Sequence, residues 1–446
     1  MMQERVCLIS LGCPKNLVDS EVILGLLSKE GYSITTQPER AEILIVNTCS
    51  FIQEATQEAI ETILQLIPYK KEGRCRLLVV SGCLPQRYGK VLEKELPEVD
   101  LFVGTGAFHR IPQILKKGRW KKSYLSGTTF LYNDRTPRIL STPSPTAYLK
   151  IAEGCSRSCT FCTVPKIRGP YRSRRLPSIL REAERLASQG VQELILIAQD
   201  TTAYGEDRGG EVSLQKLLKE LVRIDGLRWI RILYGYPQHA NFPNELLELI
   251  AKEHKMCSYL DLPIQHIDDG ILKRMGRRTK SQEIRNLLKR IRAFIPHITL
   301  RTSFIVGFPG EKDSQFESLM EFVKETQFDH LGVFKYSREE GTPASRLPDQ
   351  VPEKLKEERF KALMEVQREI SHEKYRKRIG QRVRVLVEGE GLQIGTLRGR
   401  LESQAPDIDG VVFLKGRAKP GDWVEAQILE ALPYDLIGEI KRILPD

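Results

Sequence analysis

Residues 153–162 read "EGCSRSCTFC", and this stretch decides how the middle of the chain is interpreted. It closes an apolar run, "AYLKIAEG" at 147–154, which predicts a buried strand. Cys155, Cys159 and Cys162 have C-x3-C-x2-C spacing, so three thiols share one loop at the end of that strand. Three thiolates this close can bind three irons of a 4Fe–4S cubane and leave the fourth iron open. Zinc usually takes four ligands, and neither a fourth cysteine nor a histidine lies nearby.

Strands and helices alternate from this loop towards the C-terminus. The predicted strands are 147–152, 191–198, 228–234, 258–262, 298–306 and 331–336. The helices expected between them include 177–189, 213–225, 281–294 and 313–327. Six β/α units in one run favour a barrel, or an open partial barrel, over a doubly wound sheet. A charged helix at about 352–377 leads out of this region.

The residues before the loop form a shorter alternating series. Strands are predicted at 5–11, 42–48 and 76–81, and helices at about 17–29, 52–66 and 86–95. This pattern predicts a mostly parallel sheet covered on both faces. A Pro/Ser/Thr-rich stretch at 135–146 is typical of a linker.

The C-terminal residues consist of short β-like runs separated by Gly, Pro and Asp, which predicts a small antiparallel barrel. The expected fold class is therefore α/β with this barrel appended. Its domains are an N-terminal parallel α/β sheet domain (1–135), a partial (β/α) barrel (141–377) and the small barrel (379–446).

Charge is unevenly distributed over the 446 residues. The net charge is +11, which favours an acidic partner such as RNA or a ribonucleoprotein surface. Residues 379–446 hold nine Lys/Arg against eleven Asp/Glu, so this segment is net −2 and the remainder carries +13. No apolar run approaches the ~18 residues of a membrane span, and no signal peptide is evident. We therefore expect a cytoplasmic protein with no membrane contact.

Three of the nine cysteines recur at one kind of position. Cys13, Cys49 and Cys83 each come directly after an apolar strand. The carboxyl ends of parallel strands meet at one edge of a sheet, so these thiols should converge on a second three-cysteine cluster. The alternative is that free cysteine is a common small buried residue. We adopt that alternative for Cys7, Cys75 and Cys257.

The central region resembles the radical S-adenosylmethionine (SAM) superfamily. The resemblance rests on the cysteine loop with Phe161 before its third cysteine, and on "TSFIVGFPGE" at 302–311, "LYGYP" at 233–237 and "IAQDTTAYG" at 197–205. In that superfamily the open iron holds SAM, and an electron from the cluster cleaves it to a 5′-deoxyadenosyl radical. The resemblance implies SAM contacts at Phe161, Gln199, Asp200, Tyr234, Ser303, Val306 and Gly307. No other catalytic residue is identified beyond the cluster ligands.

With the second cysteine triple, nearly the whole chain resembles the methylthiotransferase family. That family joins an N-terminal three-cysteine domain, a radical SAM barrel and a small C-terminal TRAM domain. The resemblance implies two 4Fe–4S clusters, two SAM molecules and transfer of a methylthio group to an unactivated C–H. Cys155, Cys159 and Cys162 would hold the SAM cluster, and Cys13, Cys49 and Cys83 the auxiliary cluster. An external electron donor is also implied.

The family splits between tRNA adenosine modifiers and a branch that modifies the β-carbon of an aspartate in small-subunit ribosomal protein twelve. "GCPKNLVDSE" at 12–21 looks like the ribosomal-protein branch, because the tRNA branch has Gln-Met-Asn after this Gly-Cys. "NTCSFIQEA", 47–55, and "QAPDIDGVV", 404–412, look like the same branch. A slightly acidic C-terminal barrel also suits a basic ribosomal protein better than tRNA, unless its charge is an accident of a solvated surface.

Several features of the sequence have two alternative interpretations. The ribosomal protein could be modified free or within the subunit. The basic tracts 116–122 and 272–292 are either solvated faces or contacts with ribosomal RNA. A non-catalytic iron–sulfur protein that binds RNA or transfers electrons is the rival from another class. His266 either lines the cavity or is a structural histidine.

Overall fold

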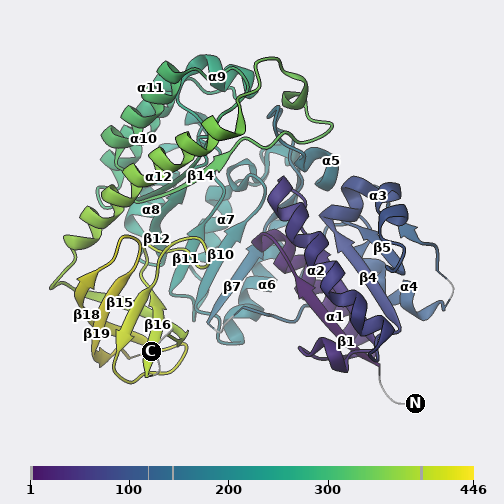
Figure 1. The fold of residues 1–446 in the computed structure, drawn as a ribbon. Coiled ribbons are helices and arrows are strands. Elements are labelled where there is room, and N and C mark those ends of the chain that lie inside the picture. The colour runs from purple at the N-terminus through teal and green to yellow at the C-terminus, as the bar shows by residue number, and fades with distance from the viewer. Residues whose placement is uncertain (1–3, 119, 143–144, 392–394, 446) are drawn as a thin grey trace.

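The computed structural model describes residues 4–118, 120–142, 145–391 and 395–445. In these residues the strands form two six-stranded sheets, one closed five-stranded barrel and a two-stranded pairing. Figure 1 shows the N-terminal sheet beside the central sheet, with the C-terminal barrel at the lower left. The predicted fold class is confirmed.

The N-terminal sheet is entirely parallel, with strand order β2-β1-β3-β4-β5-β6. Its strands are β1 Arg5–Ser10, β2 Ser33–Ile34, β3 Ile43–Thr48, β4 Leu77–Gly82, β5 Leu101–Gly104 and β6 Ser123–Tyr124. Its α-helices are α1 Pro14–Lys29, α2 Gln53–Lys71, α3 Cys83–Glu95 and α4 Ile111–Lys116. Every residue of β3 and β4 is buried, as expected of central strands covered on both faces.

The central sheet is also parallel, and its six strands follow one another in chain order without closing. The strands are β7 Thr146–Lys150, β10 Glu193–Ile197, β11 Trp229–Ile232, β12 Met256–Asp261, β13 Thr299–Val306 and β14 His330–Lys335. The helices between these strands are α5 Val164–Arg168, α6 Leu176–Ser188, α7 Leu214–Leu221, α8 Asn244–Lys252, α9 Asp269–Arg274, α10 Ser281–Phe294 and α11 Asp313–Thr326. A separate short pairing joins β8 Ala152–Glu153 to β9 Arg172–Ser173. The expected partial barrel is therefore present.

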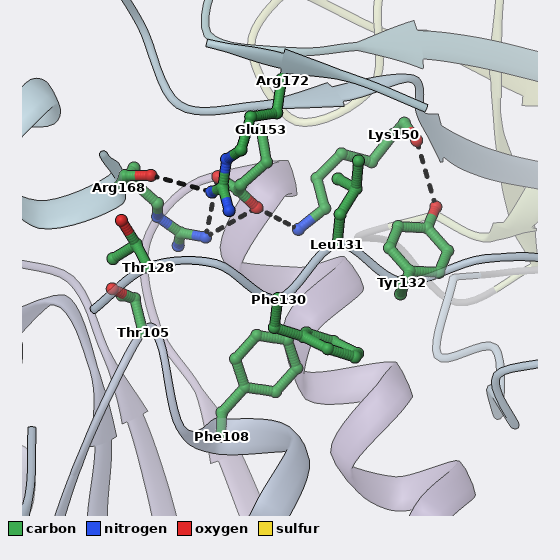
Figure 2. A pocket seen from close by; sticks show the side chains of 10 residues that line it. All are labelled: Thr105, Phe108, Thr128, Phe130, Leu131, Tyr132, Lys150, Glu153, Arg168 and Arg172. Atoms are coloured by element: carbon green, nitrogen blue, oxygen red, sulfur yellow. Dashed lines mark hydrogen bonds and ion pairs between the residues drawn. The ribbon is translucent and has the colours of Figure 1, made fainter. Parts of the chain in front are cut away.

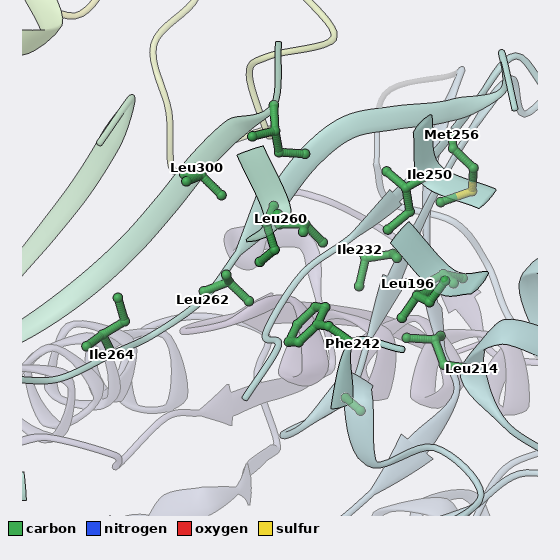
Figure 3. Close-up of a cluster of buried hydrophobic side chains, with 14 of the residues drawn as sticks. Leu196, Leu214, Ile232, Phe242, Ile250, Met256, Leu260, Leu262, Ile264 and Leu300 are labelled. Atoms are coloured by element: carbon green, nitrogen blue, oxygen red, sulfur yellow. The ribbon is translucent and has the colours of Figure 1, made fainter. Parts of the chain in front are cut away.

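A continuous apolar core joins the helices to the central sheet. In Figure 3, Phe242 lies among Ile232, Leu262 and Leu214, which come from strand, strand end and helix. The side chain of Phe242 is fully buried. Helix α8, which follows it, has nine residues and begins directly after Pro243.

The C-terminal barrel has strand order β15-β16-β17-β19-β18. Helix α12 Glu353–Arg376 leads into β15 Arg382–Glu390, β16 Thr396–Arg400, β17 Val412–Lys415, β18 Trp423–Ala431 and β19 Leu436–Ile443. Its pairings are antiparallel, as predicted, except that β17 and β19 run parallel. One of the predicted β-like runs is "QIGTLRGRLES" at 393–403, and its residues 393 and 394 lie outside the described residues.

Buried ion pairs and hydrogen bonds connect this barrel to the strands of the central sheet. The Arg400 guanidinium pairs with Glu193 of β10 and with Glu388. Asp409 accepts a hydrogen bond from the Tyr259 hydroxyl at 2.7 Å and pairs with Arg301 at 3.3 Å. Two of the acidic residues counted in the net charge of −2, Glu388 and Asp409, are thus turned inward. The net charge of residues 379–446 therefore does not describe the outer surface of the barrel.

The stretch at 135–146 is packed, in its described part, rather than loose. The Arg138 side chain is almost fully buried and pairs with Glu21 of α1 at 2.6 Å and with Glu182 of α6 at 2.9 Å. Its Nη2 also donates to the Tyr148 carbonyl at 2.8 Å. The described residues of this stretch form an irregular connection, and its composition does not reveal an arginine with partners on two distant helices. Residues 143–144, like residue 119 of the basic tract 116–122, lie outside the described residues.

Candidate active site

The first cysteine group, which consists of Cys155, Cys159 and Cys162, lies on the loop between β8 and α5. Burial, followed by the neighbouring Cys159 and Cys155, raises the pKa of the Cys162 thiol to about 12. The Arg157 amide donates to Cys155 Sγ at 3.4 Å, and Arg277 Nη1 lies 3.8 Å from Cys159 Sγ. The three thiols are therefore near one another, with backbone N–H and guanidinium groups directed at them.

The loop is held by the segment that ends α9. Thr160 donates through its amide to the Met275 carbonyl at 2.9 Å and through its hydroxyl to the Arg274 carbonyl at 2.8 Å. Gly276 has a φ of +70°, and a Cβ there would lie 2.4 Å from the Ser158 carbonyl oxygen. Only glycine allows so close an approach in this conformation. The position of the loop is thus fixed from outside the cysteine motif.

The second group is brought together at the carboxyl edge of the N-terminal sheet. Cys13 is the N-cap of α1, Cys49 follows β3 and Cys83 is the first residue of α3. A Cβ on Gly12 would lie 2.4 Å from Cys49 Cβ, so the residues that follow β1 and β3 are in contact. Burial, followed by the thiols of Cys83 and Cys13, raises the pKa of Cys49 to about 12.

Each group offers three cysteine thiols as possible metal ligands. Among the described residues no three His, Cys, Asp or Glu side chains are placed to hold one metal ion. Cubane ligands bind separate irons and need not converge on one point. Three thiols per group, with no fourth protein ligand beside them, match the donor set of a 4Fe–4S cluster with one open iron.

Arg168, the last residue of α5, connects the two cysteine groups. Its Nη2 lies 3.6 Å from Cys83 Sγ and donates to Asn16 Oδ1 at 3.1 Å. Its Nη1 pairs with Asp19 at 2.5 Å and with Glu153, which is two residues before Cys155, at 3.4 Å. The neighbouring Gly169 carbonyl accepts from the Cys155 amide at 3.0 Å. Displacing one group would therefore disturb the other.

A pocket adjoins this connection, as Figure 2 shows. Arg168 and Lys150 both point at the Glu153 carboxylate, and Lys150 Nζ lies 2.6 Å from it. Burial opposes ionisation of Glu153, yet Lys150 and Arg168 hold its pKa at about 2. The carboxylate therefore stays charged and keeps both cations in place. The pocket wall is completed by Thr105, Phe108, Thr128, Phe130, Leu131, Tyr132 and Arg172.

Two of the predicted SAM contacts lie beside the first cysteine group. Gln199 donates to Glu153 at 2.8 Å, and its Oε1 is buried without a hydrogen-bond partner among the described residues. The Asp200 carboxylate pairs with Arg157 at 2.8 Å and caps the turn at Ala203. Gln199 thus offers a free acceptor to a ligand, whereas Asp200 orients the arginine next to Cys155.

The predicted contacts on β13 are placed differently. The Val306 side chain is fully buried in the main core, while Ile305, one position earlier, packs in the cluster that includes Phe161. Gly307 lies against Lys356 of α12, whose Cγ would be 2.3 Å from an added Cβ. Ser303 is nearly buried, with Arg301 Nη1 3.5 Å from its hydroxyl. Successive residues of a strand face opposite sides, so Ser303 shares the face of Ile305 towards the cysteine loop and Val306 lies on the other face.

Tyr234 lies at the other side of the barrel mouth, next to the second cysteine group. It has a φ of +63°, an uncommon value for a residue with a Cβ. Its amide donates to Asp261 Oδ2 at 3.0 Å, and its carbonyl accepts from the Thr201 amide at 2.9 Å. Lys15 Nζ lies 3.2 Å from the centre of its ring. The strained backbone therefore holds this ring beneath a cation that comes from the N-terminal sheet.

His266 is a structural residue. It is fully buried, and its Nδ1 accepts from the Asp268 amide at 3.0 Å. Burial lowers its pKa to about 4, so it is neutral at ordinary pH.

Sequence reasoning did not single out Arg168, Glu153, Lys15 or Arg277. Lys15 and Glu153 stand within stretches quoted in the sequence analysis, and Arg168 follows the third cysteine of the first loop by six residues, so a charged residue near a cysteine motif was the available signal. Arg277 follows the glycine that fixes the first loop, but nothing local indicates that it reaches Cys159.

The chain matches three families in sequence. Residues 5–104 match the uncharacterized protein family UPF0004, residues 149–323 the radical SAM superfamily and residues 379–440 the TRAM domain. Among solved structures, the radical S-adenosylmethionine methyltransferase TsrM from Kitasatospora setae aligns with a TM-score of 0.54 at 15% identity, covering 77% of each chain. That likeness concerns the fold. Together these findings define a radical SAM enzyme, and membership of that superfamily implies SAM and a 4Fe–4S cluster.

Similarity to curated proteins identifies the family within the radical SAM enzymes to which the chain belongs. The chain is 53% identical over 444 residues to "Ribosomal protein uS12 methylthiotransferase RimO" of Geotalea uraniireducens, covering 98% of this chain and 99% of that protein. It is 53% identical over 443 residues to the protein of the same name in Geobacter sulfurreducens, with the same coverage. The chain belongs to the RimO family of radical SAM methylthiotransferases. No helix in the described part of the chain is long and apolar enough to cross a membrane.

Proposed function

We propose that this protein adds a methylthio group to the β-carbon of an aspartate in ribosomal protein uS12. The observation that carries the proposal is the pair of three-cysteine groups on either side of one interface, joined through Arg168. The substrate follows from the names of the full-length relatives. A tRNA adenosine substrate is not favoured, because these relatives are named for the ribosomal protein.

The cysteines divide the work between the two groups. Cys155, Cys159 and Cys162 hold the 4Fe–4S cluster that binds SAM, with Gln199 and Phe161 beside it. Cys13, Cys49 and Cys83 hold a second 4Fe–4S cluster. When bound, the first cluster supplies radical formation from one SAM molecule, and the second cluster supplies the sulfur that is methylated by another SAM molecule.

The protein residues orient these centres. Arg168 fixes the separation of the two groups through Asp19, Glu153 and Asn16, all of them buried. Arg157 is held by Asp200 and Glu206, so its amide stays directed at Cys155. Such fixed placement of reacting partners is the main contribution a protein makes to chemistry that its cofactors perform.

The partners are uS12, free or in the small subunit, and an external electron donor, in the cytoplasm. Contact with ribosomal RNA would come from basic residues that remain exposed on the tract 272–292. Arg277 of that tract is turned inward, since its Nη2 donates to the Pro263 carbonyl at 2.7 Å. Activity on free uS12 and on assembled subunits should differ in salt dependence if RNA is contacted, and equal slopes would exclude that contact.

Comparison of cells with and without the gene tests the substrate. Mass spectrometry of uS12 should show a gain of about 46 Da only when the protein is present, as expected for replacing H by SCH3. Digested tRNA from the same cells should be unchanged. A loss confined to a tRNA nucleoside would contradict the proposal.

A further inference from the structure

Lys15 extends from the N-terminal sheet domain into the mouth of the central barrel. It is the second residue of α1, two positions after Cys13, and its Nζ lies over the ring of Tyr234, which follows β11. The neighbouring Asn16 is fully buried and donates to the Leu11 carbonyl at 2.6 Å. The backbone that carries Lys15 is therefore fixed, and the side chain spans the gap between the two domains.

The Lys15 ammonium differs from nearby cations in having no carboxylate beside it. Lys150 and Arg168 each pair with both Asp19 and Glu153. Among the residues that the structure describes, no carboxylate lies within 4 Å of Lys15 Nζ, and its one short contact is the Tyr234 ring. Burial lowers the pKa of Lys15, and an added carboxylate would offset this cost because it would give the ammonium a charge-assisted partner.

Asp261 does not supply the missing anion. Its Oδ2 accepts from the Tyr234 amide at 3.0 Å, and its Oδ1 faces Arg301 at 3.6 Å. Arg301 in turn pairs with Asp409 of the C-terminal barrel. Asp261 is thus engaged with the strained Tyr234 backbone and with Arg301, and it forms no ion pair with Lys15 within the described residues.

We propose that Lys15 binds the carboxylate of the aspartate that is modified. The inference rests on the proposed function, which requires a side-chain carboxylate to enter between the two cysteine groups. Lys15 Nζ, next to Cys13 and above Tyr234, is placed to hold that carboxylate and so to set which carbon faces the reacting centres. Lys15 would then determine the specificity for aspartate over an uncharged residue.

Binding of two uS12 peptides to the iron-loaded protein with SAM tests this role. One peptide carries the target aspartate and the other carries asparagine at that position. The wild type should bind the aspartate peptide about 10- to 100-fold more tightly, as expected for a charge-assisted contact that is partly desolvated. Lys15→Met, which keeps the length of the side chain without its charge, should lower the affinity for the aspartate peptide to that of the asparagine peptide. Lys15→Arg should retain most of the preference.

Iron content and 5′-deoxyadenosine formation without peptide serve as controls for the integrity of both sites. If Lys15→Met loses iron, Lys15→Gln, which keeps a polar end, is tested in its place. A variant with full iron that discriminates between the peptides as the wild type does would overturn the inference. That result leaves the proposed function intact if the wild type methylthiolates the aspartate peptide, whereas a wild type that leaves both peptides unmodified contradicts the proposed function itself.

Discussion

The attachment of the C-terminal barrel to the central sheet depends on Arg400, and Arg400→Met tests that dependence. The guanidinium is almost completely buried, between Glu193 of β10 and Glu388 of β15. Glu193 is fully buried and has a second partner, Arg231, at 2.9 Å. Methionine removes the charge while keeping an unbranched side chain, so the variant leaves Glu193 with one cation instead of two.

The expected loss follows from the pKa of Glu193. Burial raises that pKa, but Arg400 and then Arg231 bring it down from 4.5 to about 2. A shift of roughly 2.5 units corresponds to about 3 kcal/mol of folding free energy, which is an upper limit for Arg400 because Arg231 shares the effect. The value agrees with the ~3–5 kcal/mol typical of breaking a buried ion pair.

Denaturant unfolding at pH 7, followed by tryptophan fluorescence, measures this loss, because Trp229 and Trp423 are in edge-to-face contact 4.5 Å apart across the same interface. Arg400→Met should lower the unfolding free energy by about 2–3 kcal/mol. Adding Glu388→Gln should recover part of the loss, since Arg400 is the cation with which the Glu388 carboxylate pairs. Because the pKa of Glu193 is depressed, the wild-type advantage should vanish as pH falls from about 4.5 towards 2. A variant within about 0.5 kcal/mol of wild type at pH 7 would refute the reasoning.

Three further outcomes are expected. Cys155→Ala should abolish formation of 5′-deoxyadenosine from SAM and reductant, and a variant that still cleaves SAM would remove this thiol from the SAM site. Cys83→Ala should preserve 5′-deoxyadenosine formation while ending methylthio transfer, and equal loss of both would contradict the division of labour between the groups. Because burial lowers the pKa of His266 from 6.5 to about 4, the unfolding free energy should fall by up to about 3 kcal/mol as pH drops through that interval. His266→Asn should flatten this dependence, and an unchanged slope would show that another group causes it.

The positions of the cysteines could be predicted because the rules involved are local. An apolar run followed at once by a cysteine places the thiol at a strand end, and parallel strands bring their carboxyl ends to one edge. Cys13, Cys49 and Cys83 therefore converge in the structure as the pattern indicated. The partial barrel was predictable for the same reason, since each β/α unit carries its own periodicity.

Features that depend on distant partners were not predictable. Of the two β13 residues named as SAM contacts, Ser303 shares the face of Ile305, which packs near Phe161, whereas Val306 lies on the opposite face in the main core. A change of one position in a strand reverses the side on which each side chain lies. Arg138 stands in a stretch whose composition is that of a linker, yet its partners are 117 and 44 residues away. The amino-acid composition of the stretch does not indicate such pairings.

A single reaction tests the central claim most directly. The protein, reconstituted with iron and sulfide, is incubated with uS12, SAM and a reductant, and the peptides of uS12 are sequenced by mass spectrometry. We predict a gain of about 46 Da on one aspartate, accompanied by formation of 5′-deoxyadenosine. Formation of 5′-deoxyadenosine with unmodified uS12, while a tRNA adenosine gains the same mass in a parallel reaction, would contradict the account.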